Sequence, residues 1–152
     1  MAWNLYDIFR HKQVANNSEA IDLNTPGGNG IKIALVTSAY SPNQNTHDFW
    51  DDVSANEVSG TNYTAGGNVC ANPGTSLDGS GNVVFDADDP ATWSADGSGF
   101  SNARRAIMYR DTGTGSTSQL IAYSDDFGAD KGNVGGDFSI ALAAAGILIA
   151  AR

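Results

Sequence analysis

The stretch VVFDADDPATW (residues 83–93) ends an apolar run in three carboxylates, those of Asp86, Asp88 and Asp89. Clustered carboxylate oxygens could bind a calcium ion, and a buried pair could act as general acid and base. The stretch does not match an EF-hand loop, which needs a central glycine and a terminal glutamate. Its small, polar neighbours predict a solvated turn. We therefore interpret the run as a strand end, with a calcium site at these three residues as the weaker alternative.

Two other acidic groups occur, at residues 51–52 and 125–130. They also lie among small polar residues and glycine, so we expect these carboxylates to be solvated. A solvated carboxylate keeps its ordinary pKa and is a weak acid catalyst at neutral pH. The sequence therefore does not favour acid–base chemistry at either group.

Other catalytic and metal-binding patterns find no support. His11 and His47 are not at ligand spacing for zinc, and no GxSxG, HExxH, GxxxxGK[ST] or CxxC motif occurs. The single cysteine, Cys70, cannot form an intrachain disulfide, and its small apolar neighbours favour a buried thiol over a reactive one. Since no nucleophile–base pair can be nominated, we expect no enzyme activity, no catalytic residue, no cofactor and no metal.

Short strands would have to position any such groups. Residues Ile31–Tyr40 give the clearest signal, because large apolar residues alternate with smaller or charged ones and β-branched residues are frequent. The apolar tail predicts a buried strand, a bend at Gly146 and a second short strand. Strand signals therefore recur along the chain, over residues 31–40, 81–89, 103–112, 118–128 and 138–151.

Two short helices are expected beside these strands. One, near the N-terminus, would place Trp3, Tyr6 and Phe9 close to one face, and the other would begin near Thr46. The 18 glycines predict many tight turns between short strands. Together these features predict an all-β fold, an antiparallel β-sandwich or jelly-roll-like barrel with one or two short helices.

Length and charge restrict the function further. The 152 residues suit one domain, and we expect an arm or short helix over residues 1–25 and a β-domain over residues 26–152. The net charge of −9 disfavours binding to nucleic acid or to an anionic membrane. The apolar tail is too short to span a bilayer as a helix, and no signal-peptide pattern is visible.

Several stretches, taken in order, resemble a group of small virion proteins of tailed bacteriophages. The resemblance covers roughly residues 31–147. It rests on the order of four kinds of motif, seen here as SAYSPNQNTH, NEVSGTNYTAGG, FDADD and FGADK. It implies a decoration or cement protein of the phage head with a β-sandwich or jelly-roll-like fold. The resemblance implies no catalytic residues, and residues 1–17 lie outside it.

The resemblance implies a partner and a location. We expect the chain to bind the outer surface of the major capsid protein on the virion head, after assembly in the host cytoplasm. Cement proteins commonly cluster at local symmetry axes, so we expect a homo-oligomer, and specifically a trimer. The alternatives are a tail, neck or fibre-adaptor component, or a carbohydrate- or calcium-binding adhesion module.

Aromatic residues are the expected contact residues, because aromatics are favoured interface anchors. We predict that Trp3, Tyr6 and Phe9 make capsid or subunit contacts, with Phe49 and Trp50 as further candidates. For Phe49 and Trp50 a place in the core is the preferred interpretation, and for Trp3 both interpretations stand. Deletion of residues 1–16 is accordingly expected to abolish capsid binding and to leave the β-domain folded.

Overall fold

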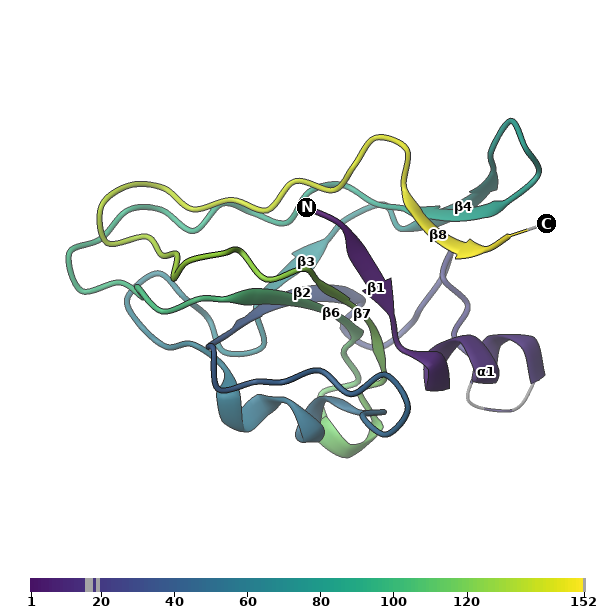
Figure 1. Ribbon diagram of the computed structural model, residues 1–152, viewed down its shortest axis with the longest axis horizontal. Coiled ribbons are helices and arrows are strands. Elements are labelled where there is room, and N and C mark those ends of the chain that lie inside the picture. Colours follow the sequence, from purple (N-terminus) through teal and green to yellow (C-terminus); the bar gives the residue numbers. More distant parts are fainter. Residues whose placement is uncertain (16–17, 19, 152) are drawn as a thin grey trace.

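The computed structural model describes residues 1–15, 18 and 20–151 and confirms the all-β prediction (Figure 1). The described part of the chain forms two antiparallel sheets and one α-helix, α1 (Asp7–Ala15). The larger sheet has the order β1 (Trp3–Leu5), β7 (Leu120–Ser124), β6 (Arg105–Arg110), β2 (Ile31–Val36), β3 (Asn68–Cys70). The smaller has the order β4 (Gly74–Leu77), β5 (Val83–Asp86), β8 (Ile147–Ala150).

The centre of the larger sheet is formed by β2 and β6. They pair over their full lengths, from Ile31 opposite Arg110 to Val36 opposite Arg105. Both strands are buried along most of their length, and a sheet covered on both faces favours continuous apolar runs over strict alternation. The strands expected at residues 31–40, 103–112 and 118–128 are therefore confirmed in shorter form.

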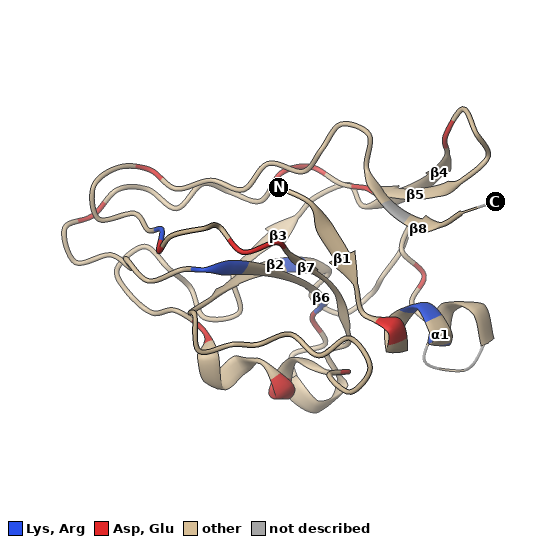
Figure 2. Ribbon diagram, viewed as in Figure 1, with Lys and Arg blue, Asp and Glu red and all other residues tan. Residues whose placement is uncertain are grey.

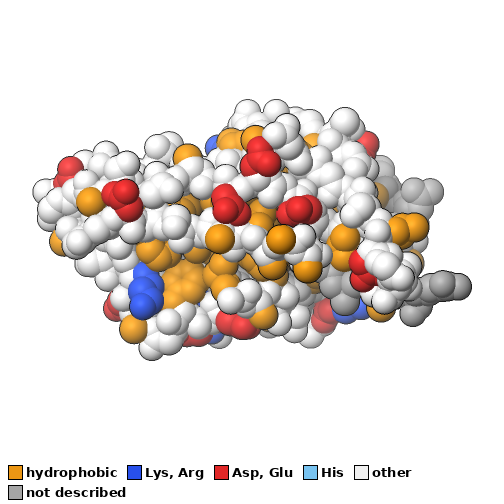
Figure 3. Space-filling model, turned by 90° about the horizontal axis from the view of Figure 1, so that it is seen from above, with side chains coloured by type: hydrophobic (Ala, Val, Ile, Leu, Met, Phe, Trp, Pro, Cys, Tyr) orange, Lys and Arg blue, Asp and Glu red, His pale blue; other side chains and the backbone are white. Residues whose placement is uncertain are grey.

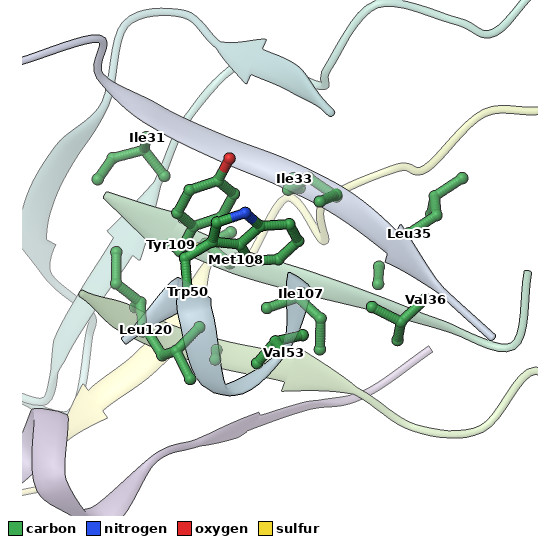
Figure 4. Packing of buried hydrophobic residues seen from close by; sticks show 14 of the residues in the cluster. Ile31, Ile33, Leu35, Val36, Trp50, Val53, Ile107, Met108, Tyr109 and Leu120 are labelled. Atoms are coloured by element: carbon green, nitrogen blue, oxygen red, sulfur yellow. The ribbon is translucent and has the colours of Figure 1, made fainter. Parts of the chain in front are cut away.

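One face of the larger sheet is covered by two short 3₁₀ helices, η1 (Trp50–Asp52) and η2 (Ser54–Asn56). The indole of Trp50 lies parallel to the ring of Tyr109, with 4.5 Å between ring centroids, and Val53 lies beside Ile107 (Figure 4). The expected helix start at Thr46 is wrong. The Asp52 carboxylate instead accepts hydrogen bonds from the backbone N–H groups of residues 48 and 49, which places the helix start at Trp50.

An aromatic cluster fills the space between the long loops at the end of the fold remote from α1. Trp93 and Phe100 meet edge to face, and Phe138 packs against both. Asn133, which is completely buried, holds the loops around them. Its Oδ1 accepts a hydrogen bond from the Phe100 N–H, and its Nδ2 donates to the carbonyl oxygens of residues 61 and 94. A single side chain therefore connects three loops.

The N-terminal segment is part of the domain, so the expected division at residue 25 is wrong. Strand β1 pairs with β7, with Trp3 opposite Ser124 and Leu5 opposite Ala122. The helical face expected to include Trp3 begins only after this strand, because the sheet holds residues 3–5 extended. Buried side chains from residues 6, 9, 21 and 23 then complete the core.

The C-terminal tail differs from its prediction in one respect. The bend at Gly146 is confirmed, with a φ of 71°, and a Cβ there would lie 2.6 Å from the Phe85 carbonyl oxygen. Strand β8 follows it as expected. The strand expected before the bend is reduced to one bridge between Phe138 and Trp93, because residues 143–145 form an exposed turn. No helix in the described part of the chain is long and apolar enough to cross a bilayer.

Candidate functional site

Two of the predicted contact residues are inaccessible. Tyr6 and Phe9 are 0% and 1% exposed, because β1 and α1 turn both rings into the core. The prediction that they contact a capsid or a neighbouring subunit is therefore wrong. Trp3 is half-buried on edge strand β1, so it can be reached by a partner.

The Tyr6 hydroxyl belongs to a buried polar chain. It lies 2.7 Å from the Tyr40 hydroxyl, which lies 2.9 Å from His47 Nδ1. Burial raises the pKa of Tyr6 far above its ordinary value and that of Tyr40 to about 12, so both phenols stay neutral. These bonds attach the N-terminal segment to the loop that precedes η1. Both hydroxyl groups bond within the protein.

Trp50 lies in the core, in line with the preferred interpretation, whereas Phe49 is half-buried and outside the core cluster. Trp50 is only 9% exposed and is stacked on Tyr109. Phe49 is half-buried beneath Lys12, whose Nζ lies 4.5 Å from the ring centroid and donates to both oxygens of Asp48. The ion pair and the ring therefore join α1 to the segment before η1.

A hollow with charged lining has a volume of about 320 Å³ and is lined by Lys32, Glu57, Asp111 and Tyr109, among others. Lys32 Nζ lies 2.7 Å from Asp111 Oδ2. Burial alone would raise the pKa of Asp111, but hydrogen bonds, above all from Lys32, lower it below its ordinary value. Burial raises the pKa of Glu57 above its ordinary value despite hydrogen bonds from the Tyr63 hydroxyl and the Gly66 N–H.

Opposed pKa shifts on two carboxylates can indicate an acid–base pair. Here, however, Glu57 Oε1 already accepts two hydrogen bonds of 2.6 and 2.7 Å, and Asp111 is neutralised by Lys32. Trp50 and Tyr109 stack on each other and are 9% and 1% exposed, so neither offers a free ring face to a sugar. The hollow therefore has the interactions of a structural polar cluster, in which Glu57 fixes the loop that carries Tyr63 and Gly66.

Glu57 gives the pH dependence of stability a defined sign. Its folded-state pKa is raised, so the stability linked to this group is present below its unfolded-state pKa and is lost as pH rises through the folded-state value. We expect Glu57→Gln, which keeps an oxygen acceptor for Tyr63 and Gly66, to remove this loss and to be more stable than wild type near neutral pH. Urea unfolding of both proteins across the acidic to neutral range measures the difference. Equal pH slopes for the two proteins would contradict the assignment.

The three carboxylates at the end of β5 do not surround a common site. Asp86 is the last residue of the strand and accepts from the next backbone N–H, Asp88 accepts from Asn72 Nδ2, and Asp89 accepts from the Leu142 N–H. All three carboxylates are exposed. Within the described residues no group of three potential ligands is placed to hold a metal ion. The calcium interpretation therefore gains no geometric support.

Arg104 is also closed into ion pairs. It binds Asp126 and Asp130 at 2.7 and 3.0 Å, and the hydrogen bond from Arg104, helped by one from the Gly128 N–H, lowers the pKa of Asp126. Figure 2 shows acidic residues spread over many loops, whereas basic residues lie mainly on the larger sheet and α1. Cys70 is buried as expected, and burial raises the pKa of its thiol to about 12, so it is not a nucleophile at neutral pH.

One face of the molecule remains open. It carries two neighbouring hollows that share Met1, of about 460 Å³ between β1 and β8, and of about 530 Å³ beside residues 125–127 and 138–141. Seen from this side, hydrophobic side chains lie in a depression among scattered acidic groups (Figure 3). An apolar depression with a charged rim is typical of a protein-binding surface.

Comparison with protein-family models, with curated proteins and with solved structures finds no match to this chain. The case for function therefore rests on the residues and on the geometry of the open face.

Two residues that organise the fold were not singled out from the sequence. Asn133 acts through partners distant along the chain, Glu57 acts through the loop that follows it, and each lies in a run of small polar residues that is typical of a loop. Trp3 is the one predicted contact residue that lies on the open face.

Proposed function

We propose that the chain is a non-enzymatic structural protein of a tailed-phage virion, a decoration or cement protein that binds the outer surface of the major capsid protein. The sequence resemblance suggests this class. The observation that carries the proposal is the open face, where an unpaired sheet edge borders a hollow of mixed polar and apolar lining beside a more apolar one, while the hollow around Lys32 and Asp111 is closed by internal bonds. Such a face suits a protein partner better than a small substrate.

Reconstitution on heads tests the proposal. The purified chain is mixed with heads assembled without it, and bound protein is measured after sedimentation. We expect saturable binding of hundreds of copies per head, as an icosahedral lattice requires. Failure to bind intact heads overturns the proposal. About a dozen copies per whole virion, located at one vertex, would favour a tail or neck component instead.

The oligomeric state is a separate part of the proposal. We expect a homotrimer, whose mass would be about three times the 15.8 kDa of one chain. Light scattering on the isolated protein and on protein released from heads measures it. A monomer under both conditions would contradict the trimer and leave lattice binding to single copies.

A further inference from the structure

The outer edge of β1 carries unpaired backbone groups. The Tyr6 N–H donates to the Ile121 carbonyl, and the Ala2 carbonyl accepts from the Asp125 N–H. In an antiparallel pair such bonded positions alternate with positions whose N–H and C=O face away. The N–H and C=O of Trp3 and of Leu5 therefore face away from β7.

Hydrogen bonds within the protein reach only one of these four groups. Gln44 Nε2 donates to the Leu5 carbonyl at 2.8 Å, and the Gln44 carbonyl accepts from the Asp7 N–H at 2.9 Å. The Trp3 N–H, the Trp3 C=O and the Leu5 N–H have no partner among the described residues. These three groups match the pattern that another extended strand would satisfy.

Strand β8 provides a partial cover for a strand in this position. Ile147 and Ile149, two residues apart, line the same hollow as Trp3 and Leu5. The indole Nε1 of Trp3 is buried there without a hydrogen-bond partner in the described structure. The hollow therefore offers main-chain hydrogen bonds from one sheet and apolar contacts from the other.

Charge defines the partner further. Asp125 lies at the start of β1, where its carboxylate accepts only from the neutral Ala2 N–H and Asn4 side chain. Asp125 is in no ion pair among the described residues, and it lines the neighbouring hollow. No acidic residue lines the hollow between β1 and β8, where Arg10 lies 3.5 Å from Asp7. One carboxylate without an ion pair, that of Asp125, therefore lies beside the first residues of β1.

We propose that the free edge of β1 binds an extended segment of the capsid partner, which adds to the larger sheet as a further strand beneath β8. The segment carries apolar side chains at alternate positions and a lysine or arginine at the flank beside Asp125. This proposal rests on the proposed function, because it specifies how the same open face holds the head lattice.

A proline variant tests the main-chain contact. Leu5→Pro removes an N–H that faces away from β7, so it leaves the pairing with β7 intact. We expect its binding to heads to be weaker by about tenfold or more, from the loss of a hydrogen bond and of the leucine contacts. Leu77→Pro is the matched control, because Leu77 lies on edge strand β4 with its N–H facing away from β5. We expect Leu77→Pro to bind like wild type.

Hydrogen exchange on the wild-type chain gives a readout that needs no variant. We expect the amides of residues 3 and 5 to exchange rapidly in the free protein and to be protected on heads, and binding to weaken as salt rises. If wild type binds heads but Leu5→Pro binds equally and residues 3–5 stay unprotected, the edge proposal is wrong and the proposed function stands. If wild type binds no heads, both fail. Protection that grows with protein concentration without heads would mean that a second copy occupies the edge, which also overturns the proposal.

Discussion

A chain that lacks residues 1–9 is expected to be unfolded at room temperature. The deletion removes β1 and the side chains of Tyr6 and Phe9, both of which are buried in the core. Removing one large buried aromatic side chain typically costs about 3–5 kcal/mol, and a domain of this kind has a total stability of about 5–15 kcal/mol. Circular dichroism and thermal unfolding measure the loss directly.

A matched substitution separates burial from position in the sequence. Val14, on α1, is 84% exposed, so we expect Val14→Ala to unfold within about 0.5 kcal/mol of wild type. A deletion variant with a cooperative transition like that of wild type would contradict the structure. It would support the sequence-based division into an arm and a separate β-domain.

Asn133→Ala is expected to destabilise the fold by about 2 kcal/mol or more. The substitution leaves the buried Phe100 N–H without an acceptor and removes the amide that bonds the carbonyl groups of Thr61 and Ser94. An unpaired buried polar group costs about 1–3 kcal/mol, and the two carbonyl groups add less because their residues are exposed. Equilibrium urea unfolding gives the free-energy difference.

The neighbouring position supplies the control. Val134 is 44% exposed, and we expect Val134→Ala to be close to wild type in the same experiment. If Asn133→Ala loses less than about 1 kcal/mol, the loops around the aromatic cluster are held by ring packing, and the amide bonds contribute little.

The sequence predicted the central strands well because their signal is local. Residues 31–36 and 105–110 combine β-branched and apolar side chains, and the side chains on both faces of these two strands are mostly buried. The bend at Gly146 was also predictable, since only glycine suits a positive φ pressed against another backbone. Strands β3 and β4 were missed because they are short and polar, and their pairing depends on neighbours from elsewhere in the chain.

The N-terminal segment and the candidate site were harder to predict for the same reason. Trp3, Tyr6 and Phe9 have a spacing that fits a helix, but pairing with β7 extends the first of them and burial in the core fixes the other two. The open edge of β1 depends on strand order, which periodicity does not encode. The sequence thus indicated Trp3 as a contact residue without indicating the backbone groups beside it.

The pairing of the first strand with a late one constrains how the protein can be made. Asn4 bonds to Asp125, 121 positions further along, and β5 pairs with β8, which lies at residues 147–150. A ribosome must therefore release residues up to Ser124 before the larger sheet is complete, and residues up to Ala150 before the smaller one is. Until then β1, β6 and β5 expose edges that can pair with other nascent chains. Expression at low temperature or with chaperones is expected to raise the yield of correctly folded protein.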